Sequence, residues 1–73
     1  MIPMSFTKEG SLMKIEKLLT ENSIKKHLME IGISKGSHIT IVKNDSTGLI
    51  INLEGSKIAL DKSLASKIYV LEI

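Results

Sequence analysis

Residues 48–60 read GLIINLEGSKIAL, and this stretch decides the fold. Its first half alternates in the period of a strand that turns one face toward a core. The inward-facing set is Leu49, Ile51 and Leu53. The pair Gly55-Ser56 follows, and glycine in the first position of a two-residue loop indicates a type II′ turn. Residues 57–60 return from this turn, so we expect an antiparallel hairpin with Ile58 in the core.

Three other segments have strand patterns, namely residues 12–19, 37–43 and 68–73. Their inward residues include Met13, Ile15, Ile39 and Ile41. The alternation of the first segment breaks at Leu18, where we expect a turn to begin, and residues 44–48 have the composition of a loop. Another set of apolar side chains falls on the opposite face of these strands: Val42, Ile50, Leu71 and Ile73. The pattern leaves open whether they stay exposed or close a second face.

Two segments have helical patterns. In residues 23–31 one apolar stripe is formed by Ile24, Leu28 and Ile31, and Asn22 or Ser23 is expected to cap the helix. Residues 62–67 form a single helical turn after Asp61, which can cap it. Glycines are expected to make the structural turns at positions 32, 36, 48 and 55, that is Gly32, Gly36, Gly48 and Gly55.

These elements predict a mainly β protein: about five short antiparallel strands, one two-turn helix and one short helical turn. A small, partly open barrel is the economical way to protect the strand edges. The 73 residues have room for a single domain. Residues 1–10 form an apolar hook that includes Phe6. It is either a frayed terminus or a segment that packs on the barrel or on a partner, and its apolar character favours packing.

Composition excludes several functions. Phe6 and Tyr69 are the only aromatic residues, which is too few to line a groove for proline-rich peptides or to stack single-stranded nucleic acid. The ten basic residues are all lysines, and the lack of arginine argues against a nucleic-acid surface. No apolar run is long enough for membrane insertion. The absence of cysteine fits a cytoplasmic protein and removes thiolate ligands and nucleophiles.

The sequence contains little evidence for a metal site or a catalytic site. A transition-metal site would need both imidazoles, His27 and His38, together with Glu30 or Asp45, and nothing in the spacing brings them together. Residues 32–36 lack the Gly-Lys-Ser/Thr ending of a phosphate-binding loop. We therefore expect no cofactor, no resident metal and no enzyme activity, with two surface histidines.

Partner binding is the remaining class of function. Lys25, Lys26 and Lys35 could form a positive patch for an acidic partner, although exposed lysines on a short helix are usually only solvated. Phe6 is the best apolar candidate on the hook. The oligomeric state and the contact face are left open.

Two blocks in order resemble the FeoA family, ferrous iron transport protein A. Residues 28–39 keep the pattern Leu-x-x-x-Gly-Ile-x-x-Gly-Ser-x-Ile. Residues 48–60 are followed by Ala65-x-x-Ile68-x-Val70, and residues 3–10 are similar to the start of short clostridial-type members. No single motif is specific, but the order and spacing of both blocks extend over nearly the whole chain.

The resemblance implies an SH3-like barrel and a cytoplasmic accessory role in ferrous iron uptake, with docking on the GTPase-bearing membrane transporter FeoB as partner. An alternative is a metal-sensing domain related to the C-terminal domain of iron-dependent repressors, and a third is a repressor fragment that contacts a helix-turn-helix protein. Many family members carry Arg where this chain has Lys25, Lys26 and Asp61. Partner contacts here would therefore differ from contacts made by arginine forks.

Overall fold

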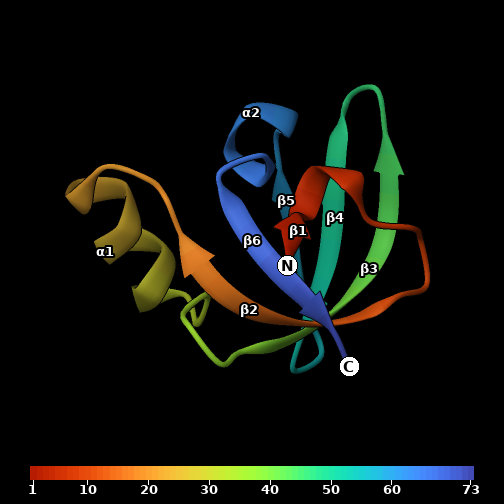
Figure 1. The fold of residues 1–73 in the computed structure, drawn as a ribbon, viewed down its shortest axis with the longest axis horizontal. Helices are drawn as coiled ribbons and strands as arrows, with labels where there is room; N and C mark the ends of the chain where they lie inside the picture. The colour runs from red at the N-terminus through yellow and green to blue at the C-terminus, as the bar shows by residue number, and fades with distance from the viewer.

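The computed structural model describes residues 1–73 and contains one six-stranded antiparallel sheet that curls on itself (Figure 1). The strand order is β1-β6-β2-β3-β4-β5. The elements are β1 (Ile2–Pro3), the 3-10 helix η1 (Met4–Phe6), β2 (Leu12–Leu18), α1 (Asn22–Glu30), β3 (His38–Asp45), β4 (Gly48–Leu53), β5 (Ser56–Leu60), α2 (Lys62–Ala65) and β6 (Ile68–Glu72). The sixth strand is β1, which pairs with β6 and which the apolar pattern of the hook did not predict.

The β4–β5 hairpin forms as expected, but its turn is different. Leu53 pairs with Ser56, so the two central residues are Glu54 and Gly55. Both have positive φ, 52° and 88°, which is the pattern of a type I′ turn. The predicted type II′ turn centred on Gly55 and Ser56 is therefore wrong by one residue. A type I′ turn matches the twist of the two strands, and Gly55 adopts its conformation without a steric cost.

The segment predicted as a loop, residues 44–48, is mostly strand. β3 continues to Asp45 and β4 begins at Gly48, which leaves only two residues for the turn. The side chain of Asp45 stabilises this short turn, because its Oδ1 accepts a 2.9 Å hydrogen bond from the backbone N–H of Thr47. The register of β3 against β4 shifts between Ile41 and Lys43, so that the inward alternation ends before the strand does.

A second register shift explains the break in the pattern of β2. Ile15 pairs with Val70, but Lys17 pairs with Tyr69, so one extra residue is accommodated at Glu16. A β-bulge of this kind reverses the side-chain alternation. Leu18 consequently points inward, where it is 8% exposed. It ends the strand as a core residue and does not begin a turn.

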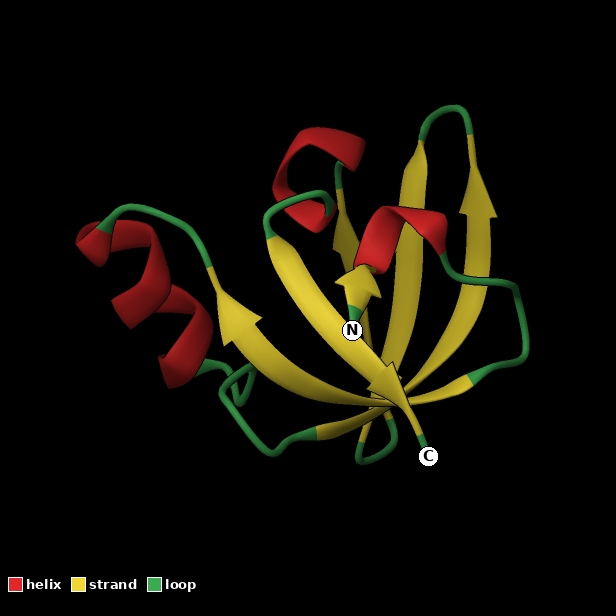
Figure 2. Ribbon diagram, viewed as in Figure 1, coloured by secondary structure: helices red, strands yellow, loops and turns green.

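The strands form one curled sheet (Figure 2), and the core is an aliphatic cluster of 15 buried residues. It contains the predicted inward set, which includes Met13, Ile15, Ile39, Ile41, Leu49, Ile51 and Leu53. Ile58 is only half-buried and packs against this cluster. The structure thus has the mainly β, SH3-like architecture that the sequence and the resemblance led us to expect.

Helix α1 departs most from its pattern. It lies beside the sheet, beyond the tip of β2 (Figure 1), and only Leu28 is buried. Ile24 and Ile31, expected on the same buried stripe, remain 40% and 41% exposed. The N-terminal cap is Glu21, without a side-chain hydrogen bond, so the predicted cap by Asn22 or Ser23 is not formed. A helix of nine residues with one buried anchor gains little from packing.

The short helix α2 follows its prediction more closely. Asp61 caps it, with its Oδ1 accepting a 2.7 Å hydrogen bond from the N–H of Leu64. It contacts η1, and the two lie together near one end of the curled sheet (Figure 1). None of the helices combines the length and the apolar character that are needed to cross a membrane.

Candidate functional site

A surface groove of about 460 Å³ opens where β2 ends, between α1 and the loop that leads to β3. Its lining comes from three segments that are separated in the chain: Glu16, Lys17, Leu18, Leu19, Lys25, Met29, Ser34 and Lys35. The volume lies in the range of small binding clefts, roughly 300–1,000 Å³. The bulge at Glu16 and the outward position of α1 together create this groove.

The groove has an apolar part. Leu18 is nearly buried and belongs to the core, whereas Leu19 and Met29 are 49% and 55% exposed. Exposed apolar side chains scattered singly are normal on protein surfaces, but here two of them share one hollow. This part of the groove can hold an apolar side chain of another molecule.

The groove is also positively charged. Lys17, Lys25 and Lys35 take part in none of the three ion pairs of the molecule. The one carboxylate of the lining, Glu16, lies 3.3 Å from Lys14 Nζ and is already compensated there. The lining of the groove therefore includes three lysines that form no ion pair, together with apolar side chains.

The structure brings together only part of the predicted partner-binding set. Lys25 and Lys35 line the groove, but Lys26 is exposed on α1 without lining it. Phe6 lies on η1, outside the groove, and is 75% exposed. Sequence reasoning missed Lys17, Leu19 and Met29. Leu19 ends the first strand pattern and Met29 lies off the predicted apolar stripe, so no local pattern marked them as surface-groove residues.

The glycines expected to form turns all have positive φ: Gly32, Gly36, Gly48 and Gly55. The tightest position is Gly48, where an added Cβ would lie 2.6 Å from the carbonyl oxygen of Leu60. Any side chain there would push β5 away from β4. The shape of the sheet next to α2 therefore depends on this glycine.

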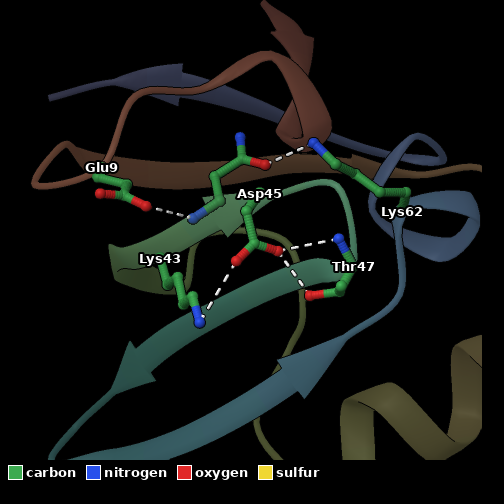
Figure 3. A network of polar contacts seen from close by, with 6 residues as sticks. Glu9, Lys43, Asp45, Thr47 and Lys62 are labelled. Carbon is green, nitrogen blue, oxygen red and sulfur yellow. Dashed lines mark hydrogen bonds and ion pairs between the residues drawn. The ribbon is translucent and has the colours of Figure 1, made fainter.

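A polar network lies away from the groove and ties the N-terminal segment to the sheet (Figure 3). The side-chain Nδ2 of Asn44 donates to the carbonyl oxygens of Ser5 and Thr7, at 3.2 and 2.7 Å. Its Oδ1 accepts a 2.6 Å hydrogen bond from Lys62 Nζ, and its backbone N–H donates to Glu9 Oε2 at 2.9 Å. These four hydrogen bonds connect the N-terminal segment to β3 and β3 to α2.

Asp45, the next residue, has an unusual acidity. The hydroxyl and the backbone N–H of Thr47 donate to its Oδ1 at 2.6 and 2.9 Å, and Lys43 Nζ lies 3.3 Å from its Oδ2 (Figure 3). These hydrogen bonds stabilise the carboxylate, with the hydroxyl of Thr47 contributing most, and lower the pKa of Asp45 to about 2. The carboxylate is thus held as an acceptor within its own turn.

The structure does not assemble the ligand set of the metal hypothesis. His27 Nδ1 lies 4.0 Å from Glu30 Oε1 on the exposed side of α1. His38 lines a different pocket, next to Glu54 and Gly32. No group of three or more His, Asp or Glu side chains lies close enough to hold a metal ion. The two histidines and Asp45 do not share a site.

Comparison with known proteins identifies relatives over the full length. The family model described as "FeoA domain" matches residues 2–72. A candidate Fe(2+) transport protein A from Methanocaldococcus jannaschii is 34% identical over 70 residues, which cover 96% of this chain and 85% of that protein.

Solved structures share the fold. The crystal structure of an iron uptake regulatory protein, FeoA, superposes with a TM-score of 0.90 at 23% identity, and covers 99% of this chain and 97% of that one. IdeR from T. acidophilum superposes with a TM-score of 0.87 at 19% identity, but this chain covers only 34% of it. At these identities the two structures indicate the fold alone.

Proposed function

This protein belongs to the FeoA domain family, and we propose that it is a non-enzymatic accessory protein of ferrous iron uptake that docks on the cytoplasmic part of the transporter FeoB. The family is linked to Fe(2+) transport, as the name of the relative from Methanocaldococcus jannaschii indicates. The docking step, its location in the cytoplasm and the identity of the partner are the parts that we propose.

The groove between β2 and α1 is the observation that carries the proposal. It combines exposed apolar side chains, which often mark an interaction site, with lysines that can complement an acidic partner surface. The other polar cluster, around Asn44, is saturated by bonds within the chain. Because that cluster is already bonded, we choose the groove as the docking surface.

Docking can influence transport only through a difference in affinity. A bound domain shifts the equilibrium between two states of a transporter only as far as it binds one state more tightly than the other. We therefore expect this protein to distinguish the GTP-bound form of FeoB from its GDP-bound form.

The experiment is an association assay with purified, detergent-solubilised FeoB, loaded either with GDP or with a non-hydrolysable GTP analogue. We expect retention of FeoB on the immobilised protein, with a clear difference between the two nucleotides. FeoB without its cytoplasmic domain serves as the control and should not be retained. A lack of association with both nucleotide states would refute the proposal.

A further inference from the structure

We propose that the groove between β2 and α1 binds an extended acidic segment of the partner that carries at least one apolar side chain. This inference rests on the proposed docking function and deepens it, since it names the surface and the chemistry of the segment that the surface recognises. It follows from the charge, the apolar lining and the free strand edge of the groove.

The charge argument concerns the three lysines of the lining. Lys17, Lys25 and Lys35 come from β2, α1 and the loop before β3, and none of them has an acidic partner in this chain. Several like charges along one hollow raise its positive potential, and an anionic ligand is attracted to such a potential. The groove is therefore complementary to carboxylates and unfavourable for a basic segment.

The apolar argument selects a peptide over a simple anion. Leu19 and Met29 are about half exposed, and Leu18 lies between them and the core. A small anion would leave this apolar area in contact with water. A side chain such as Leu or Phe would cover it, and the flexible Met29 can adapt to its shape.

The edge of β2 favours an extended conformation. β2 pairs with β3 only from Leu12 to Lys14, whereas its pairing with β6 continues to Leu18. Ile15 still binds the loop before β3, because its N–H donates to Ser37 O at 2.8 Å and its carbonyl oxygen accepts from Gly36 N–H at 2.7 Å. Only residues 16–18 are thus paired with a strand on one side alone, and all three line the groove. An extended segment that adds to such an edge gains main-chain hydrogen bonds while its side chains alternate between the groove and solvent.

The first test uses a synthetic peptide in which Glu and Leu alternate, added to the isotope-labelled protein. We expect NMR shifts to be largest at Lys17, Leu19 and Met29, and affinity to fall as salt is added. The control peptide has Lys in place of Glu and should not bind. Shifts centred elsewhere, or equal binding of both peptides, would overturn the inference.

The second test uses matched charge reversals on neighbouring residues of α1. Lys25→Glu should weaken binding of the acidic peptide by roughly two- to fivefold, and the triple reversal with Lys17→Glu and Lys35→Glu by roughly tenfold or more. Lys26→Glu makes the same change one residue away, outside the lining, and should leave the affinity nearly unchanged. Equal effects of the Lys25 and Lys26 variants would contradict a defined groove.

The apolar contribution is tested by Met29→Ser. The side chain is exposed, so the fold should persist. We expect a several-fold loss of affinity that added salt does not mask, because burial of apolar area is not screened. An affinity that remains as in the wild type would show that only charge is recognised.

Two further arms separate this inference from the docking proposal and from other anions. If FeoB binds the wild type and the triple variant equally, docking stands and the groove is the wrong surface. If FeoB fails to bind while the peptide binds in the groove, the docking proposal fails and the peptide specificity stands. Tighter binding of phosphatidylserine vesicles or of an oligonucleotide to the same lysines would overturn the choice of an acidic peptide.

Discussion

The N-terminal segment and helix α1 both lie at the periphery of the sheet, but they are attached in different ways. The N-terminal segment places Met4 fully inside the core and is tied to β3 and α2 through Asn44. Helix α1 contributes a single buried side chain, Leu28, and leaves Ile24 and Met29 exposed, as is Ile31, which follows the helix. The N-terminal segment is thus packed on the core, whereas a groove remains beside the loosely attached helix α1.

The comparison shows that apolar composition alone does not tell which peripheral segment will be buried. Both segments contain aliphatic residues at comparable density. The N-terminal one is fixed because β1 pairs with β6 and because two of its carbonyl groups bind Asn44, whereas α1 makes no side-chain hydrogen bond to the sheet. Hydrogen-bond partners at the periphery thus help to hold the apolar residues of the segment against the core.

The largest expected difference in the free energy of unfolding is between variants of two apolar residues of the N-terminal segment. Met4→Ala should lower the free energy of unfolding by roughly 2–5 kcal/mol, because it leaves a cavity in a core that cannot collapse easily. Phe6→Ala removes a larger side chain, but one that is 75% exposed, and should change it by about 0.5 kcal/mol or less. Urea denaturation of both variants measures the difference, and similar losses would show that Phe6 is also packed.

The next largest effect on stability is expected from the hydrogen bonds by which Asn44 holds the N-terminal segment. Asn44→Ala removes the hydrogen bonds to Ser5, Thr7 and Lys62 and should cost roughly 1–3 kcal/mol. Asn52→Ala on the neighbouring strand β4 serves as the control. Asn52 is also half-buried but makes no side-chain hydrogen bond, and its loss should cost less than about 1 kcal/mol. Denaturation midpoints compare the two, and an equal cost would refute a special role of Asn44.

A smaller difference is expected in native-state hydrogen exchange. Because α1 has one buried anchor, its amides should exchange by local opening, roughly tenfold or more faster than the amides of β3 and β4. The amides of Thr7 and Gly10, which donate to Met4 and Ile41, should be protected more than those of α1. Exchange of α1 at the rate of the sheet would mean that the helix opens only with global unfolding.

The smallest effect is the acid dependence of the turn at Asp45. Its pKa is lowered to about 2, so the stabilisation that it provides is complete above the ordinary pKa and is lost as the pH falls toward 2. An NMR titration should show that the Asp45 carboxyl protonates well below the ordinary pKa of an aspartate. Thr47→Val removes the main donor and should raise the pKa of Asp45, whereas an unchanged titration would contradict that cause.

Much of the sheet was predictable because its signals are local. The alternation of Leu49, Ile51 and Leu53 follows from the two-residue period of strands, and it is confirmed by their burial. The features of the sheet that were predicted wrongly or not at all have a common cause. The bulges near Glu16 and Val42 and the one-residue difference at the Glu54-Gly55 turn depend on how two strands align, and one strand alone does not contain that information.

The candidate site was predictable only in part. Lys25 and Lys35 were recognised as positive, but their proximity to Lys17 depends on where α1 lies relative to β2. The amphipathic stripe of α1 predicted a helix packed along its length, and the structure holds it by Leu28 alone. That placement turned Met29 into a groove residue, although it lies off the predicted stripe.

Local patterns were sufficient to indicate the family, the hairpin of residues 48–60 and the aliphatic interior, because period and turn chemistry act between near neighbours in the chain. The strand registers, the burial of Met4 and the joint position of Lys17, Lys25 and Lys35 became evident in the folded molecule. These features depend on contacts between distant segments, and their energies are set by packing and by hydrogen-bond partners that no local pattern specifies.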